Sequence, residues 1–252
     1  MKCSLLALII SFFCFSIFAQ LNQVDAKGKK QGEWGKLYDG TKVFLYKGQF
    51  VNDKPVGKFT YYYPSSKVKA VIKHDPNSNR SVAYYYHDNG ALMSYGIFRN
   101  QLKDSVWLNF GPSQRISNTE TFKNGKLEGK KVIYYVPELA SDKSQIPSTI
   151  SYYKNDMLDG DYTEYFDGKN VKVKGVYSLG KKEGVWTHYS TSGKPMMIFR
   201  YQKGVMHGWA FGYDDAGKEI GKKYYYHGRH LEGKILEEKM RQMKELGINP
   251  NE

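Results

Sequence analysis

The sequence predicts an all-β protein, an elongated antiparallel meander of about eight 24-residue β-hairpin repeats with a short C-terminal capping helix. Two observations lead to this prediction. One short motif recurs at nearly constant spacing, and the segments between its copies are rich in aromatic and β-branched residues. The chain has 252 residues, of which 22 are Tyr, 13 are Phe, 25 are Gly and only 8 are Pro. This composition suits many strands joined by tight turns, and it differs from that of a disordered chain.

The repeat consists of an aromatic residue seven positions before a glycine. Phe50 and Gly57 form one such pair, and Tyr177 and Gly184 form another. Successive copies are 24 or 25 residues apart, except for one step of 31 residues that contains the segment Val136–Pro147, which we interpret as a surface loop. The glycine position, which we call the anchor, is held in order by Gly32, Gly57, Ser81, Ser105, Gly129, Gly160, Gly184, Gly208 and Gly233.

Each repeat reads as one β-hairpin. A strand of aromatic and apolar residues follows the anchor, and Trp107 and Trp186 occupy the same place in two of these strands. A six-residue turn centred on a pair such as Asn89-Gly90 comes next, because such pairs supply the positive φ angles of tight hairpins. A second strand, such as Val171 to Tyr177, then leads to a short turn and the next anchor.

The alternation along these strands predicts which face of the sheet is packed. The face that carries Val106, Leu108, Val185 and Thr187 is apolar from one repeat to the next, whereas the face of the two tryptophans is mixed. We therefore expect the Val106 and Val185 side to form the stacked core, with paired aromatic residues on adjacent strands adding to it.

The N-terminal segment is predicted to be a secretory signal over residues 1–19. A short basic start precedes an apolar run from Leu5 to Ala19, although an uncleaved anchor helix is the alternative. Both cysteines, Cys3 and Cys14, lie in the predicted signal segment, so the exported chain would contain no disulfide and no thiolate ligand. We expect an exported protein, located in the periplasm, the outer envelope or the medium.

The rest of the chain divides into a repeat array over residues 20–232 and a C-terminal helix and tail over residues 233–252. Residues Lys234 to Leu246 have helical composition, and Gly247 followed by Pro250 ends the pattern. A terminal repeat leaves an open sheet edge, so we expect the helix to cap that end. The alternative is a helix that binds a partner or lies on a membrane.

The repeat resembles the MORN family. The segments Tyr46 to Gly57 and Gly175 to Gly184 follow the family framework Tyr-x-Gly-x-Trp-x-x-Gly-x-x-x-Gly, the second without its leading Tyr. An aromatic residue such as Phe59 or Trp186 replaces the next glycine, as in the bacterial MORN variant repeat. Proteins with that variant are often labelled as antitoxin components of toxin–antitoxin systems. The resemblance covers residues 25–233 and implies a role as a scaffold, a dimerisation strip, a phospholipid-associated module or an antitoxin-like binding protein.

Basic residues form the most regular candidate site. The whole chain has 38 Lys and Arg against 25 Asp and Glu, a formal net charge of +13. One lysine recurs just after the short turn, and a second basic set lies on strands. Stacked hairpins would align the turn lysines about 10 Å apart, where they would bind an anionic surface or simply solubilise the edge. The candidates are Lys42, Lys67, Lys169, Lys194 and Lys218 in turns, with Lys172, Lys174 and Arg200 on strands.

The sequence gives little support for catalysis, metal binding or nucleic-acid binding. No nucleophile, phosphate-loop or zinc-protease motif occurs, so we expect no catalytic residues and no enzyme. The six histidines include one close pair, His227 and His230, which is too few ligands for a metal, and we expect no cofactor. His207 occupies the position before an anchor, where other repeats carry acids. We do not expect nucleic acid as a partner of an exported protein.

These observations leave three hypotheses for function. The first is an exported, non-enzymatic repeat scaffold that binds a protein or itself. The second is a peripheral membrane or envelope module whose lysine ladder binds anionic lipid or lipopolysaccharide. The third is antitoxin-like or immunity-like binding, which follows from the family resemblance alone.

Overall fold

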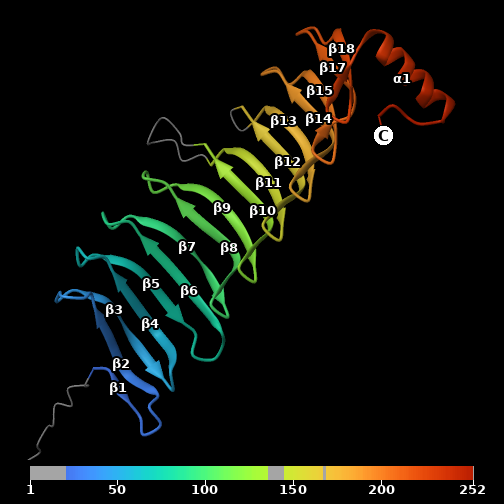
Figure 1. The fold of residues 1–252 in the computed structure, drawn as a ribbon. Helices are drawn as coiled ribbons and strands as arrows, with labels where there is room; N and C mark the ends of the chain where they lie inside the picture. The colour runs from blue at the N-terminus through green and yellow to red at the C-terminus, as the bar shows by residue number, and fades with distance from the viewer. Residues whose placement is uncertain (1–20, 136–144, 167–168, 252) are drawn as a thin grey trace, which may run out of the picture.

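The structure is a computed structural model that describes residues 21–135, 145–166 and 169–251. The predicted signal segment and most of the 136–147 insertion lie outside these described residues. Within them the chain forms one open antiparallel sheet of nineteen strands, followed by a single helix, α1 (Gly233–Glu245). Figure 1 shows the hairpins stacked along one direction, with α1 beside the last strands. The predicted all-β meander with a C-terminal helix is confirmed.

The strands follow one another in space as they do in sequence, and β15 pairs with both β16 and β17. Their bounds are β1 (Gln23–Val24), β2 (Lys30–Leu37), β3 (Phe44–Val51), β4 (Lys54–Tyr62), β5 (Val68–His74), β6 (Arg80–Tyr86), β7 (Leu92–Arg99), β8 (Leu102–Phe110), β9 (Ile116–Lys123), β10 (Lys126–Tyr134), β11 (Pro147–Lys154), β12 (Met157–Tyr165), β13 (Val171–Ser178), β14 (Lys181–Tyr189), β15 (Pro195–Gln202), β16 (Val205–Met206), β17 (Gly208–Tyr213), β18 (Glu219–Tyr226) and β19 (Arg229–Leu231).

The two long edges of the sheet carry different turns. On one edge most turns have two residues with positive φ, such as Asn52 at 51° and Asp53 at 67° between β3 and β4. Such turns match the twist of the strands they join. On the other edge, which we call the loop edge, the connections are mostly five residues long rather than the six expected. One example is closed by the Tyr63 N–H, which donates to the Lys67 carbonyl at 2.8 Å.

Most anchors form a bulge at the start of the following strand. Lys174 pairs with Thr187 and Val176 pairs with Glu183, so Gly184 and its two successors face Gly175 alone. Gly184 has φ +64°, a left-handed conformation that glycine adopts without strain. Three anchors differ. The strands at Gly32 and Ser81 pair there without a shift in register, and Gly233 begins α1 instead of a strand.

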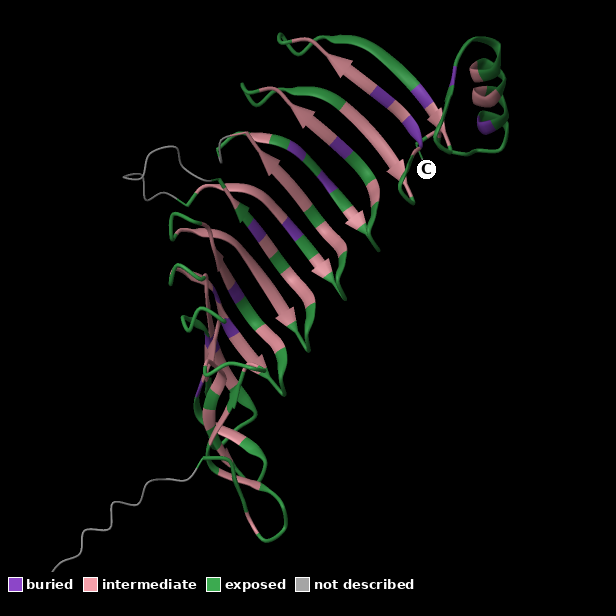
Figure 2. Cartoon of the chain, turned by 60° about the vertical axis from the view of Figure 1, so that its left-hand side comes forward, coloured by how far each residue is buried: buried purple, intermediate pink, exposed green. Residues whose placement is uncertain are grey.

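The packed side of the sheet is the face that carries Phe59, Trp107 and Trp186, which we call the ring face. Trp107 and Trp186 are each 1% exposed, whereas their neighbours Val106 and Val185 on the opposite face are each 48% exposed. We call that opposite face the open face. The expectation that the open face forms the core is therefore wrong. In Figure 2 the buried positions alternate with exposed ones along single strands, as this one-sided packing requires.

Aromatic rings are covered on the ring face because glycine lies beneath them on the preceding strand. A Cβ atom at Gly96 would overlap the Trp107 ring, and one at Gly175 would overlap the Trp186 ring. The indoles therefore lie against bare backbone, which shields them from water in a sheet of one layer. The pattern along one strand does not show on which face the adjacent strand has glycine and can accommodate a ring. The predicted core was wrong for this reason.

The ring-face tryptophans also lie under lysine ammonium groups from their own strands. A cation placed over an indole contributes about 0.5–1 kcal/mol at an exposed site. This explains why a basic side chain recurs two positions before the anchor wherever tryptophan stands two positions after it. The pairs are Lys30 with Trp34, Lys103 with Trp107 and Lys182 with Trp186, at 4.7, 4.4 and 4.1 Å from the nitrogen to the ring centroid.

Helix α1 packs on the open face of the last repeat, as its predicted capping role requires. Met243 of the helix is buried together with Tyr224 and Leu231, and Trp209 packs against this cluster. The Tyr224 hydroxyl also donates to the Pro250 carbonyl at 3.1 Å, which ties the tail to the sheet. Over the ranges that the structure describes, no helix is long and apolar enough to span a bilayer.

Candidate binding surfaces

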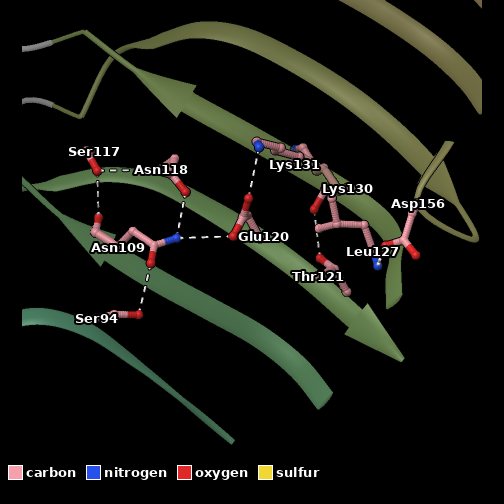
Figure 3. A network of polar contacts seen from close by, with 10 residues as sticks. All are labelled: Ser94, Asn109, Ser117, Asn118, Glu120, Thr121, Leu127, Lys130, Lys131 and Asp156. Atoms are coloured by element: carbon pink, nitrogen blue, oxygen red, sulfur yellow. Dashed lines mark hydrogen bonds and ion pairs between the residues drawn. The ribbon is translucent and has the colours of Figure 1, made fainter. Parts of the chain in front are cut away.

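A polar network interrupts the ring face between β7 and β10 (Figure 3). The Asn109 amide donates to Asn118 Oδ1 at 2.7 Å and its carbonyl accepts from the Ser94 hydroxyl at 2.9 Å. Lys131 holds the place where other repeats carry a ring, and its ammonium binds Glu120 at 2.8 Å. The members satisfy one another, so the network links adjacent hairpins. Sequence reasoning missed it, although the change from a ring to Lys131 at one repeat position was a signal.

The open face is the larger exposed surface. Apolar and tyrosine side chains follow one another across its strands, and among the described residues α1 covers only the last repeat. Exposed lysines lie among them, and Lys58 of β4 lies directly opposite Lys73 of β5. Like charges placed opposite each other destabilise a sheet slightly, so a negatively charged partner would reduce the repulsion between these lysines. The exposed apolar members in mid-sheet are Val106, Tyr152, Val176 and Val185.

The loop edge carries the predicted turn lysines. All five are exposed and lie in the connections of this edge, although Ala91 interrupts the series where a lysine would continue it. The Lys194 ammonium donates to the Asp215 carbonyl of the next loop at 2.9 Å, which links two loops. The series is Lys42, Lys67, Lys169, Lys194 and Lys218.

The predicted strand cations do not form one surface. Lys172 lies 3.7 Å from the Glu164 carboxylate, and Lys174 is exposed on the open face. Arg200 is half-buried, and its guanidinium donates to the Trp209 carbonyl at 3.2 Å. One guanidinium nitrogen of Arg200 is therefore used to link β15 to β17 in the last repeats.

The histidines have structural surroundings. His207 Nδ1 accepts a bond from the His227 N–H at 3.3 Å, just as the Glu183 carboxylate accepts one from the Lys203 N–H at 2.8 Å. The residue before the anchor thus secures the next tight turn, whether it is an acid or a histidine. Among the described residues, no three His, Cys, Asp or Glu side chains gather closely enough to hold a metal ion.

Two ring-face histidines have shifted acidities. Burial lowers the pKa of His74, whose Nδ1 lies 2.8 Å from the Ser81 hydroxyl. Burial also lowers the pKa of His188, and the Lys182 ammonium lowers it further while the Glu164 carboxylate opposes this effect. Both side chains therefore favour the neutral form in the folded protein.

Comparison with protein-family models gives no match for this chain, and comparison with curated proteins gives none. The MORN resemblance stays a prediction from the motif. The function proposed below therefore depends on the geometry of the described residues.

Proposed function

We propose that this protein is a non-enzymatic binding scaffold that holds a protein partner on its open face. One observation carries the proposal: the apolar open face is left uncovered over most of the sheet, yet α1 covers it in the last repeat. Large exposed apolar surfaces mark interaction sites in soluble proteins. The predicted signal segment adds that the scaffold acts outside the cytoplasm.

The chemistry of the surface suggests the kind of partner. In the last repeat the open face accepts the apolar side of a helix, with Met243 packed between Tyr224 and Leu231. Further along the sheet the same face carries exposed Lys58, Lys73, Lys130 and Lys174 among its apolar side chains. A partner segment that presents both apolar and acidic side chains complements both features.

The experiment is affinity capture of the mature chain, residues 20–252, from the envelope fraction of its own cells. Val106→Asp and Val185→Asp each place a carboxylate in the middle of the open face, where the native side chains are 48% exposed. We expect these variants to fold, because neither valine is buried, and to lose the captured protein. Ile133→Asp is the matched control on the ring face, at 42% exposure.

Capture that survives both open-face variants would contradict the proposal. Capture lost equally with Ile133→Asp would also contradict it, because the ring face or general folding would then be responsible. Circular dichroism and thermal melts of all three variants separate loss of binding from loss of fold.

A second candidate function is binding of an anionic envelope surface by the loop edge. The observation that favours it is the exposure of all five turn lysines along one edge of the sheet. Charge reversal of Lys42, Lys169, Lys194 and Lys218 should abolish salt-sensitive sedimentation with anionic liposomes or lipopolysaccharide. Sedimentation that is absent in the unaltered chain would rule this candidate out.

A further inference from the structure

The ring face ends in an apolar hollow of about 410 Å³ between β15, β17 and β18. Its walls include Met197 and Phe199 on β15, and Ile220 and Tyr225 on β18. Met197 is 46% exposed and Ile220 is 69% exposed, so both present apolar surface to solvent. This hollow lies on the opposite face from α1.

The floor of the hollow is a pair of glycines, Gly212 and Gly221, which lie directly opposite each other on β17 and β18. A bulge follows this pair where the two strands enter the loop edge. Seven other hairpins have a pair at the same place before such a bulge, and all of these pairs carry side chains. They are Lys36 with Tyr46, Tyr61 with Ala70, Tyr85 with Ser94, Asn109 with Asn118, Ile133 with Thr149, Glu164 with Val173, and His188 with Met197.

Nothing within the described chain requires glycine at these two positions. Neither Gly212 nor Gly221 has a left-handed φ angle. A Cβ at Gly221 would meet no atom within 4 Å, and one at Gly212 would make only ordinary contacts of 3.8 Å. Glycine inside a strand costs about 0.5–1 kcal/mol relative to alanine, and it often marks close approach by another group.

The same sheet shows which group fits bare backbone on this face. The rings of Phe59, Trp107 and Trp186 each lie against a glycine of the preceding strand. We propose that an aromatic side chain of a partner protein binds in the hollow and stacks on Gly212 and Gly221 as these rings do on their glycines. Met197, Phe199, Ile220 and Tyr225 then surround the ring, and burial of an aromatic side chain supplies the affinity.

The charge beside the hollow favours an acidic flank on the aromatic residue. Lys222 and Lys223 are the charged residues that line it. Lys222 places its ammonium 4.9 Å from the Trp209 ring, so Lys223 is the cation left for a ligand. Lys223 lies opposite Ala210 on the ring face, next to the proposed ring position. A carboxylate adjacent to the aromatic residue would pair with it.

The test uses the mature chain with methyl-labelled methionine and two capped tripeptides, Asp-Trp-Asp and Asp-Ala-Asp. We expect the tryptophan peptide to shift the Met197 methyl resonance saturably while the Met196 resonance stays in place. Met196 is the matched reporter, because it is its neighbour in sequence and also exposed, at 38%. Equal responses to the two peptides, or no response, would overturn the proposal.

Two variants make the site assignment specific. Gly221→Val fills the hollow with the side chain that Val173 carries at the equivalent position, and it should weaken peptide binding at least about tenfold without loss of thermal stability. Lys223→Gln should weaken binding of the Asp-Trp-Asp peptide and remove its salt dependence. Unchanged affinity in a folded Gly221→Val protein would contradict the assignment. The site is on the ring face, so its failure leaves the open-face proposal untouched.

Discussion

At the scale of single residues, the backbone angle φ identifies one strained anchor. Ser105 occupies an anchor with φ +60°, the left-handed region in which the other bulged anchors carry glycine. An L-residue held there costs about 1–2 kcal/mol. The serine therefore marks a strained position in an otherwise regular array, and its Oγ–H bond to the Asp104 carboxylate, at 2.8 Å, compensates in part.

Replacing Ser105 by glycine should raise the free energy of unfolding by about 0.5–1 kcal/mol, because strain is removed at some cost in chain entropy. The reciprocal change Gly184→Ser should lower it by about 1 kcal/mol. A Cβ at Gly184 would meet no atom within 4 Å, so only backbone strain is altered. Urea denaturation of both variants checks the pair. Effects of the same sign would show that the anchor angle does not control stability.

Two half-buried histidines predict a dependence of stability on pH. The pKa values of His74 and His188 are lowered in the folded state, so the unfolded chain binds more protons near pH 6. Stability should therefore be fully present above about pH 6.5 and fall as the pH drops below that value. Hydrogen bonds also lower the pKa values of Asp25 and Asp75. Protonation of these two carboxylates would reduce stability only at lower pH than protonation of the histidines.

Denaturant titrations at pH 7.5 and pH 5.0 measure this difference. His188→Gln should reduce it, because glutamine does not titrate, and His74→Gln should reduce it for the same reason. Equal stability of the unaltered protein at the two pH values would refute the role of these half-buried imidazoles.

At the scale of elements, each hairpin is fastened to the next by repeated side-chain bonds at both edges. At the tight turns, Asp53 and Asp156 accept bonds from the backbone N–H groups of Lys30 and Leu127 in the preceding hairpin, at 2.8 and 2.7 Å. At the loop edge the Tyr63 hydroxyl donates to the carbonyl of residue 86 at 2.7 Å. Since each hairpin contacts mainly its neighbours, stability is a sum of such local terms.

The ring-on-glycine contact is the main packing unit between adjacent strands. Gly175→Ala should lower the free energy of unfolding by about 1–3 kcal/mol, because the added Cβ would overlap the Trp186 ring. Gly221→Ala is the matched control, since its Cβ would meet no atom within 4 Å and the change should be neutral or stabilising. Thermal melts of the two variants measure the contrast. Equal destabilisation would mean that a strand glycine matters for its flexibility and not for the ring above it.

At the scale of the whole molecule, the fold is a single sheet, and no second layer packs on its open face over most of the described repeats. Within the described ranges, helix α1 covers this face over the last repeat alone. Truncation after Glu232 removes the helix and should expose Trp209, Tyr224 and Leu231. We expect faster hydrogen exchange in β17 to β19 and concentration-dependent association, because newly exposed apolar surface favours self-contact.

Met243→Asp in the full chain should produce a milder form of the same result, since Met243 is 3% exposed in that cluster. Size-exclusion chromatography with light scattering detects the association. A monomeric truncated chain with unchanged exchange would show that α1 is not a structural cap, which would instead favour its alternative role in binding a partner.

Much of this architecture was predictable because a repeat enforces it. The constant spacing of the anchors predicted the hairpins, and pairs such as Asp39-Gly40 predicted the loop edge on which Lys42 lies. Local chemistry is sufficient there, since a tight turn needs particular residues wherever it occurs. The helical composition of residues 234–246 likewise predicted α1, to within one residue at each end.

The sequence by itself therefore determined the period, the hairpins and the terminal helix of this protein, because each of these depends on neighbouring residues. Only the tertiary structure decided which face is packed, that Arg200 links β15 to β17, and that Gly212 and Gly221 meet beneath an apolar hollow. These depend on which residue of one strand lies opposite or beneath which residue of the next. An alternating strand is compatible with either face inward, and the choice is made by the room that glycine leaves for a ring on the adjacent strand.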